Sequence, residues 1–260
     1  MTILDKIIKN KRKEVILHAG VVAVRDLENS RLFNRDVISL SEFLLNKSKT
    51  GIIAEFKRKS PSKGIINSLS AVEEVTAGYF MKGASGVSIL TDFQFFGGSN
   101  ADLTAVREKS FFPILRKDFI IDEYQVIESK SIGADVILLI AAVLDDKEIL
   151  SLSKLSRSLG MEVLLEIHEP DELNKVNQYV NIIGVNNRNL KTFEVNTDIS
   201  EKLAEIIPDG FLKISESGIS SSKVLKKLRV SGYNGFLVGE KFMSTPDPVR
   251  AFSEFVKDLI

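Results

Sequence analysis

The sequence predicts an α/β protein in which eight parallel strands alternate with helices and close into a (β/α)8 barrel, preceded by an N-terminal helical extension. Three observations support this prediction. Eight short apolar segments recur along the 260 residues, segments with helical character lie between them, and the apolar segments follow one another at nearly regular intervals. This alternation is typical of parallel strands that are covered by helices.

The first 48 residues read as helices. The segment "ILDKIIKNKRKEVILH" has apolar residues at positions 3, 4, 7, 8, 15, 16 and 17. Its basic middle at 9–14 is expected to be a solvated helix face and not a nucleic-acid patch. "SLSEFLLNK" follows, with Ser39 or Ser41 as its N-cap. We therefore expect one domain over 1–260, with a helical extension at 1–48 and the barrel at 49–260.

Eight segments after the extension read as strands rich in Ile, Val and Leu. They are "GIIAEFK" at 51–57, "GVSILTD" at 86–92, "FPILRKD" at 112–118, "DVILLIA" at 135–141, "EVLLEIH" at 162–168, "NIIGVNN" at 181–187, "FLKISES" at 211–217 and "GFLVGE" at 235–240. Most of these runs are too continuous for one-sided antiparallel strands, so we expect parallel strands that are buried on both faces.

The segments between the strands carry helix start signals. Asp122, Asp145 or Asp146, Ser220 or Ser221, and Asp247 are suited to N-caps, and Pro170 and Pro248 fit first helical turns. Three further helices are expected in "SAVEEVTAGYFMKGA", "NADLTAVREK" and "VNTDISEKLAEII".

The spacing of the strands favours closure. Their ends, taken at residues 57, 91, 117, 140, 166, 186, 216 and 239, lie 20 to 34 residues apart. Eight units at such intervals indicate a closed TIM barrel, with an open doubly wound sheet as the alternative on pattern alone.

Composition excludes several classes of protein. There is no cysteine, which excludes disulfides, zinc–thiolate sites and iron–sulfur clusters, and only His18 and His168 could supply imidazole ligands, so no metal site is expected. Basic and acidic residues balance at 35 each, which disfavours nucleic-acid and membrane-surface binding. No secretory signal or membrane span is recognisable, so we expect a soluble cytoplasmic protein.

Charged or amide side chains stand at the strand ends, where barrel enzymes place their chemistry. Those expected to face the lumen by strand alternation are Glu55, Lys57, Lys117, Glu166, Asn186 and Glu216. Two lysines and three carboxylates in one cavity would have coupled pKa values suited to general acid–base catalysis. A buried structural ion-pair network is the alternative interpretation.

Two further signals indicate a ligand with a phosphate and an aromatic ring. Gly218 and Gly239 follow the seventh and eighth strands, where barrels often bind phosphate through backbone N–H groups, and Lys57 and Ser60 could add to that site. "FFGGS" at 95–99 and Phe119 offer aromatic surface, although Phe119 could equally be core.

Seven motifs in order resemble those of the indole-3-glycerol phosphate synthase family. They are "AEFKRKSPSKG", "SILTDFQFFGGS", "PILRKDFIIDEYQV", "LLEIH", "IGVNNRNLKTFEV", "ISESGI" and "FLVGEKFM". The resemblance covers nearly the whole chain, including the helical extension. It implies a lyase (a decarboxylase) of tryptophan and thus aromatic amino acid biosynthesis. The implied reaction converts 1-(2-carboxyphenylamino)-1-deoxyribulose 5-phosphate into indole-3-glycerol phosphate, CO2 and water without cofactor or metal.

The resemblance also implies a role for each candidate residue. Lys117 would be the general acid and Glu166 the general base or electrostatic partner of the dehydration. Glu55 and Lys57 would form the strand-one pair, with Lys57 either holding a substrate anion or shuttling a proton. The polar shell would comprise Asn186, Arg188, Glu216 and Ser217. Phosphate would rest on Ser60, Gly218, Gly239 and the backbone of Glu240, and the anthranilate-derived ring on Phe96 and Phe119.

Two positions depart from the family pattern. Glu240 stands where a small serine is often found, so only its backbone N–H is expected to face a phosphate; Asn189 replaces an aspartate and could alter a hydrogen bond that holds Arg188. For His168, a position on the surface or in a turn is expected in preference to a role as a partner of Glu166. The chain is expected to be monofunctional, and docking onto other tryptophan-pathway enzymes is left open.

Two rival functions fit a phosphate-binding barrel. One is phosphoribosylanthranilate isomerase, whose family normally uses a cysteine–aspartate pair that a chain without cysteine cannot supply. The other is a non-catalytic barrel that binds a phosphorylated ligand. That rival predicts loss of Lys117 or Glu166, and both are present.

Overall fold

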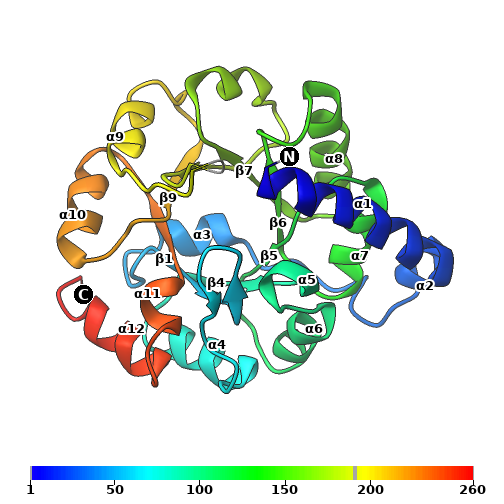
Figure 1. The fold of residues 1–260 in the computed structure, drawn as a ribbon, viewed down its shortest axis with the longest axis horizontal. Helices are drawn as coiled ribbons and strands as arrows, with labels where there is room; N and C mark the ends of the chain where they lie inside the picture. The colour runs from blue at the N-terminus through cyan, green and yellow to red at the C-terminus, as the bar shows by residue number, and fades with distance from the viewer. Residues whose placement is uncertain (1, 190–191, 260) are drawn as a thin grey trace.

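The computed structural model describes residues 2–189 and 192–259 and contains a closed barrel of eight parallel strands (Figure 1). The strands are β1 (Ile52–Phe56), β4 (Gly86–Leu90), β5 (Ile114–Lys117), β6 (Val136–Ile140), β7 (Glu162–Ile167), β8 (Ile182–Asn186), β9 (Leu212–Glu216) and β10 (Gly235–Val238). Each predicted strand segment contains one of them. Because β1 pairs with both β4 and β10, the closed barrel is confirmed and the open sheet is wrong.

The strands are buried on both faces, as their continuous apolar runs predict. Side chains that point outward pack beneath the helices in one large core. Side chains that point inward, such as Ile53, Leu115, Leu164 and Ile214, form a second cluster that fills the lumen. The lumen is therefore packed, and a site can open only where polar side chains replace this filling at the strand ends.

Helices surround the barrel. They are α1 (Ile3–Val21), α2 (Val24–Glu28), α3 (Leu40–Leu45), α4 (Val72–Met81), α5 (Phe93–Phe96), α6 (Asn100–Glu108), α7 (Glu123–Ser131), α8 (Asp146–Ser158), α9 (Asp198–Ala204), α10 (Ser222–Val230), α11 (Glu240–Met243) and α12 (Pro248–Val256). Among the predicted N-caps, Ser39, Asp122, Asp145, Ser221 and Asp247 accept a hydrogen bond from the first turn of their helices.

Three segments differ from the expected local structure. Pro170–Lys175 (η1) is a 3-10 helix and not an α-helix; it is a single short segment of six residues with Pro170 in its first turn, and the 3-10 form occurs mainly in short segments. The segment before Gly97 contains the short helix α5, capped by Asp92. The loop after β1 contains a small hairpin of β2 (Lys59–Ser60) and β3 (Gly64–Ile65).

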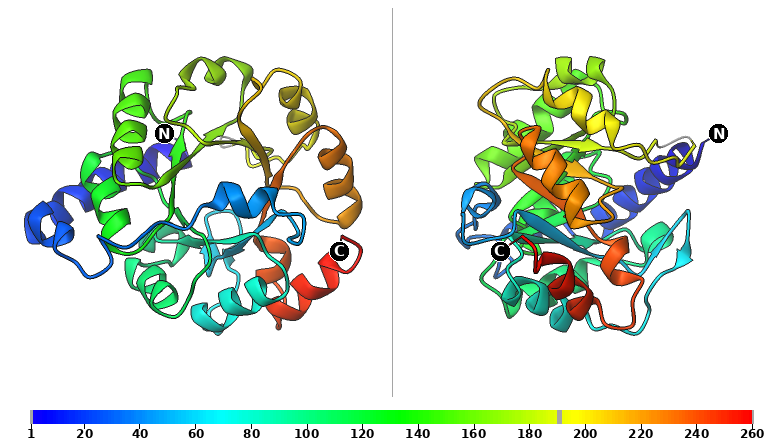
Figure 2. Two further views of the ribbon diagram at one scale, coloured as in Figure 1. Left: turned by 180° about the vertical axis from the view of Figure 1, so that it is seen from behind. Right: turned by 90° about the vertical axis from the view of Figure 1, so that its left-hand side faces the viewer.

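The N-terminal extension covers both ends of the barrel. In Figure 1, α1 crosses in front of the barrel, and the side view in Figure 2 places α1 and α3 at opposite ends. Leu40 and Leu44 of α3 pack into the luminal cluster beside Gly86 and Gly235, at the starts of β4 and β10. No helix within the described ranges has the length and apolar character needed to cross a membrane.

Candidate active site

A cavity of about 530 Å³ opens at the carboxyl ends of the strands. The structure brings all fourteen predicted site residues to its wall: Glu55, Lys57, Ser60, Phe96, Lys117, Phe119, Glu166, Asn186, Arg188, Glu216, Ser217, Gly218, Gly239 and Glu240. The geometry places them together, and their individual roles remain predictions.

Glu55 and Lys57 form one ion pair at the end of β1. Alternation along the extended chain points both side chains to the lumen, as predicted. The Lys57 ammonium donates a hydrogen bond of 2.6 Å to Glu55 Oε1. Gly239 permits this arrangement, since a Cβ atom there would lie 2.5 Å from the same oxygen. The glycine after β10 thus makes room for the carboxylate of β1.

Lys117, at the end of β5, lies between two carboxylates that come from β7 and β9. Its Nζ is 2.9 Å from Glu166 Oε2 and 2.6 Å from Glu216 Oε2. Burial by itself would lower the pKa of Lys117, but the carboxylates of Glu166, Glu216 and Glu55 outweigh burial and raise that pKa above its usual range. Lys117 therefore enters any reaction as a firmly protonated ammonium.

The pKa values of Glu166 and Glu216, the two carboxyl groups beside the Lys117 ammonium, are shifted in opposite directions. Burial disfavours the charge of both. For Glu166, Lys117 overcomes burial, assisted by the Asn186 amide that donates to Oε1 at 3.1 Å, and its pKa is lowered to about 2. For Glu216, burial prevails over Lys117, with added repulsion from Glu166 and Glu55, and its pKa is raised to about 7. Glu166 is thus the anion, and Glu216 can hold a proton near neutral pH.

His168 corrects an expectation. The sequence favoured a surface or turn histidine, but its side chain is only 12% exposed and Nε2 lies 3.4 Å from Glu166 Oε1. The two residues are two positions apart at the end of β7, so both point to the same side. A positive charge on His168 would further stabilise ionised Glu166. The spacing of two residues along the strand is the sequence signal that could have predicted this contact.

Glu240 and Arg188 show how the departures from the family pattern are accommodated. The Glu240 carboxylate lies 3.6 Å from Arg188 Nη2 and 3.8 Å from Lys63 Nζ. Two cations thus surround the carboxylate that would otherwise repel a phosphate. Arg188 also donates to the carbonyl of Phe193, and the loop that supplies this carbonyl is bonded back to Asn189. Leu190 and Lys191, part of the same predicted motif, lie outside the described residues.

The turn after β9 has an unusual backbone. Ser217 and Gly218 both have positive φ, at 65° and 75°. A side chain at Gly218 would meet Val195 at 2.6 Å, so only glycine fits without a shift. This turn, Gly239 after β10, Ser60 and Glu240 all line the cavity.

Part of the cavity lining is apolar. The rings of Phe96 and Phe119 lie with centroids 6.1 Å apart. Ile3, Leu4 and Ile7 of α1 line the same cavity, which the sequence interpretation missed. The apolar residues at positions 3, 4 and 7 were visible in the sequence, but nothing local indicated which surface they cover. Within the described part of the chain, no group of three or more His, Cys, Asp or Glu side chains is suited to hold a metal ion.

The basic segment at 9–14 is not uniformly solvated, contrary to expectation. Lys11 is fully buried, and its Nζ lies 3.0 Å from Asp92 Oδ2 and 2.9 Å from Asp118 Oδ1. These carboxylates stand in the turns after β4 and β5. Lys11 also contacts Glu14 Oε1 at 2.9 Å within α1, but the two buried aspartates are about 80 and 107 residues away in the chain, so no local pattern predicts that Lys11 is buried.

A closed parallel barrel whose strand-end cavity carries ionisable side chains from four strands, β1, β5, β7 and β9, defines a TIM-barrel protein of the enzyme type. A family model described as indole-3-glycerol phosphate synthase matches residues 4–255. The chain belongs to the indole-3-glycerol phosphate synthase family.

Individual relatives agree with this assignment. A protein of Bacteroides thetaiotaomicron named indole-3-glycerol phosphate synthase is 46% identical over 256 residues, covering 98% of both chains. One of the same name from Albidiferax ferrireducens is 41% identical and covers 97% of both chains. Among solved structures, 3-hexulose-6-phosphate synthase from Salmonella typhimurium superposes with a TM-score of 0.59 over 81% of this chain and 100% of that one. At 14% identity, that likeness shows the fold alone.

Proposed function

We propose that this chain is an indole-3-glycerol phosphate synthase, a carboxy-lyase of tryptophan biosynthesis. It would close the ring of 1-(2-carboxyphenylamino)-1-deoxyribulose 5-phosphate with loss of CO2 and water. The observation that carries this proposal is the Lys117 ammonium held between Glu166 and Glu216 beside an aromatic pocket, in a chain of this family. A cytoplasmic location and docking onto other pathway enzymes stay predictions.

Ring closure needs an acid at the substrate ketone. The ring carbon that bears the carboxylate attacks the carbonyl carbon, and the carbonyl oxygen takes a proton as the new carbon–carbon bond forms. Lys117 supplies that proton in our proposal. Its raised pKa makes release difficult while both carboxylates remain in contact. When the substrate oxygen replaces one of them, the stabilisation of the ammonium falls and proton transfer becomes easier.

Decarboxylation and dehydration follow from the same intermediate. Loss of CO2 returns the bonding electrons to the ring and restores its aromaticity. The new hydroxyl then leaves as water while the adjacent methylene carbon, the one bonded to nitrogen, loses a proton, which forms the carbon–carbon double bond of the indole ring. Ionised Glu166 is the proposed base of this step, and Glu216, whose pKa of about 7 lets it hold or release a proton, can return protons to Lys117. The steps transfer protons and release CO2 and water, and none needs an external oxidant or reductant, so the proposed reaction calls for no redox cofactor.

The remaining residues would hold the substrate. Phe96 and Phe119 would pack the anthranilate-derived ring. Phosphate would rest on Ser60, Gly218, Gly239 and the backbone of Glu240. Arg188, Asn186 and Ser217 would orient the polar groups. Lys57, paired with Glu55, would hold the substrate carboxylate or phosphate or shuttle a proton, so the cost of burying this ion pair would be offset by an anionic ligand.

The test is direct. Purified protein is mixed with the substrate in the presence of EDTA, and the indole fluorescence of the product is followed. The chain contains no tryptophan, so its own background is low. Lys117→Ala is measured alongside, with circular dichroism and thermal unfolding to show that both proteins fold.

We expect wild-type turnover and a fall in kcat of at least about a thousandfold in Lys117→Ala, because general-acid catalysis and charge stabilisation are both lost. Turnover that survives in the variant would move the acid elsewhere, with Lys57 as the first candidate. No turnover by folded wild-type protein would overturn the proposed function.

A further inference from the structure

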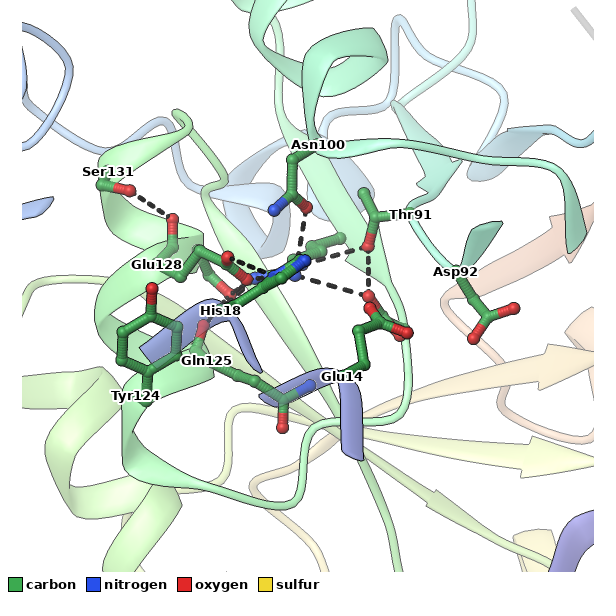
Figure 3. A network of polar contacts seen from close by, with 12 residues as sticks. Glu14, His18, Thr91, Asp92, Asn100, Tyr124, Gln125, Glu128 and Ser131 are labelled. Carbon is green, nitrogen blue, oxygen red and sulfur yellow. Dashed lines mark hydrogen bonds and ion pairs between the residues drawn. The ribbon is translucent and has the colours of Figure 1, made fainter. Parts of the chain in front are cut away.

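The ion-pair network around Lys11 is the most extensive charged cluster that the proposed mechanism leaves unused. Lys11, Asp92, Asp118 and Arg116 are each nearly inaccessible to solvent. Glu14 and His18 come from α1, Thr91 and Asp92 from the turn after β4, and Glu128 from α7 (Figure 3). One polar network thus joins the N-terminal helix to two strand-end turns and to the helix behind them.

Lys11 contacts two turns with one ammonium. Asp92 uses Oδ1 to accept the Phe95 N–H at 2.7 Å as N-cap of α5, and its Oδ2 lies 3.0 Å from Lys11 Nζ. Asp118 uses Oδ1 both to accept the Phe119 N–H at 2.8 Å and to contact Lys11 Nζ at 2.9 Å. Each carboxylate therefore shapes a turn and is held by the same lysine.

These two turns carry cavity residues. α5 ends with Phe96, and Asp118 stands between Lys117 and Phe119 in the chain. A shift of Asp92 would move Phe96, and a shift of Asp118 would move Phe119 and the backbone of Lys117. The separation of the two rings, now 6.1 Å between centroids, depends on both turns.

The other side of the network limits how Asp118 can move. Thr91 donates to Asp118 Oδ2 at 2.5 Å and accepts from Arg116 Nε at 3.1 Å. Arg116 donates to Glu128 Oε2 at 2.7 Å and to Asn100 Oδ1 at 3.1 Å. Burial lowers the pKa of Lys11, but Asp118 and Asp92 outweigh burial and raise it overall, so Lys11 stays charged.

We propose that Lys11 is a positioning residue for the reaction: its buried ammonium clamps the turns after β4 and β5 onto α1, and so sets the place of Lys117 and the spacing of Phe96 and Phe119. This inference rests on the proposed function for its kinetic consequence. The structural part of the inference, that Lys11 holds the two turns in place, rests only on the observed contacts of Lys11 with Asp92 and Asp118.

The kinetic test compares Lys11→Met with wild type. Methionine keeps much of the side-chain length and removes the charge. We expect kcat to fall at least about tenfold, because small displacements of reacting groups have large effects on rate. KM should change less than about threefold, since Lys11 contacts the turns after β4 and β5, whereas most of the proposed phosphate contacts follow β9 and β10. Lys11→Arg, which restores the positive charge, should recover most of the lost kcat.

Arg107→Met is the matched control. Arg107 is a buried cation paired with Asp135 at the start of β6, the end of the barrel away from the cavity. Its loss should lower stability but leave kcat within about twofold, because that end of a barrel serves stability. Equal losses of kcat in the two variants, or an unchanged kcat in folded Lys11→Met, would overturn the proposal.

Two further measurements keep the inference testable. If Lys11→Met does not fold, Asp92→Asn retains an N-cap but loses the ion pair, and it should lower kcat in the same direction. A crystal structure of either variant should show Lys117 or the two rings displaced by about 1 Å, the scale on which rates respond. Unchanged positions would refute the clamp. Because comparing structures requires no enzymatic activity, this measurement tests the role of Lys11 even if the wild-type protein is inactive and the proposed function is overturned.

Discussion

At the scale of single residues, the charges of the cavity do not balance. Glu55, Glu166 and Glu216 face two ammonium groups, on Lys57 and Lys117. One of the three carboxyl groups therefore lacks a cation of its own. That group is Glu216: burial disfavours its ionised form and raises its pKa to about 7. A carboxyl group that is protonated near neutral pH beside an ionised one is a common arrangement in acid–base sites.

This imbalance predicts a pH dependence of stability. The folded pKa of Glu216 lies above its unfolded value, so its contribution is fully present below about pH 4.5 and is lost as pH rises through about 7. Glu216→Gln imitates the protonated form at every pH. Between pH 5 and 8, the free energy of unfolding of the wild type should fall by about 2 kcal/mol relative to that of the variant.

Urea denaturation at several pH values measures this difference. Glu254→Gln, on the exposed face of α12, serves as a control in which the two curves should stay parallel. Parallel curves for Glu216→Gln as well would mean that Glu216 is ionised throughout.

At the scale of elements, helices α1 and α3 of the N-terminal extension cover opposite ends of the barrel. Residues of α1 line the cavity at the carboxyl ends of the strands, whereas α3 packs against the luminal core at the other end. The apolar positions 3, 4 and 7 of α1 face a cavity, and Leu40 and Leu44 of α3 face a filled core. The same periodicity thus serves ligand contact in one helix and stability in the other.

This division predicts that α3 can be weakened without loss of activity. Leu44→Ala leaves a cavity in the luminal core and should lower the free energy of unfolding by about 2–4 kcal/mol. Its kcat/KM at 25 °C should remain within about twofold of the wild-type value, because the strand ends that carry the site are remote from α3. Thermal unfolding and steady-state kinetics on the same preparation test both parts.

Leu45→Ala is the matched control for this prediction. Leu45 is the next residue in α3 and is 59% exposed. Its loss should change stability by less than about 0.5 kcal/mol. A large loss of activity in Leu44→Ala would show that α3 is coupled to the site.

At the scale of the whole molecule, buried carboxylates paired with cations connect distant parts of the chain. Burial opposes their charge, but Lys117 lowers the pKa of Glu166 to about 2. In the same way, Lys11 and Arg116 lower the pKa of Asp118, and Arg116 lowers that of Glu128. These pairs join α1, β5, β7 and α7, so their protonation affects the assembled barrel and not one local element.

The resulting prediction concerns acid. Because these folded pKa values lie below the unfolded ones, their stabilisation is present above about pH 4.5 and is lost as pH falls below it. The free energy of unfolding should decrease by several kcal/mol, on the order of 3, between pH 5 and pH 3. Urea denaturation across this range measures the slope. Asp118→Asn should reduce it, and an unchanged slope in that variant would contradict the assignment of Asp118.

Much of the fold and site could be predicted because the information is local. A run such as "VILLI" specifies a buried parallel strand, and an N-cap such as Asp145 needs only its own helix. Closure then gathers the strand ends, so Lys117, Glu166 and Glu216 come together without any direct sequence signal between them. The four-residue helix α5 was missed, because a loop with Gly97 and Gly98 resembles a turn.

The sequence by itself determined the order and type of the barrel strands and which strand-end side chains reach the cavity, since alternation and strand direction follow from backbone geometry. The tertiary structure alone decided that Lys11 is buried, that Arg188 and Lys63 surround Glu240, and that α1 covers the cavity. These contacts join residues far apart in the chain. These contacts form only when the barrel closes and the helices pack on it, and the local periodicity of the sequence does not encode which distant side chains then meet.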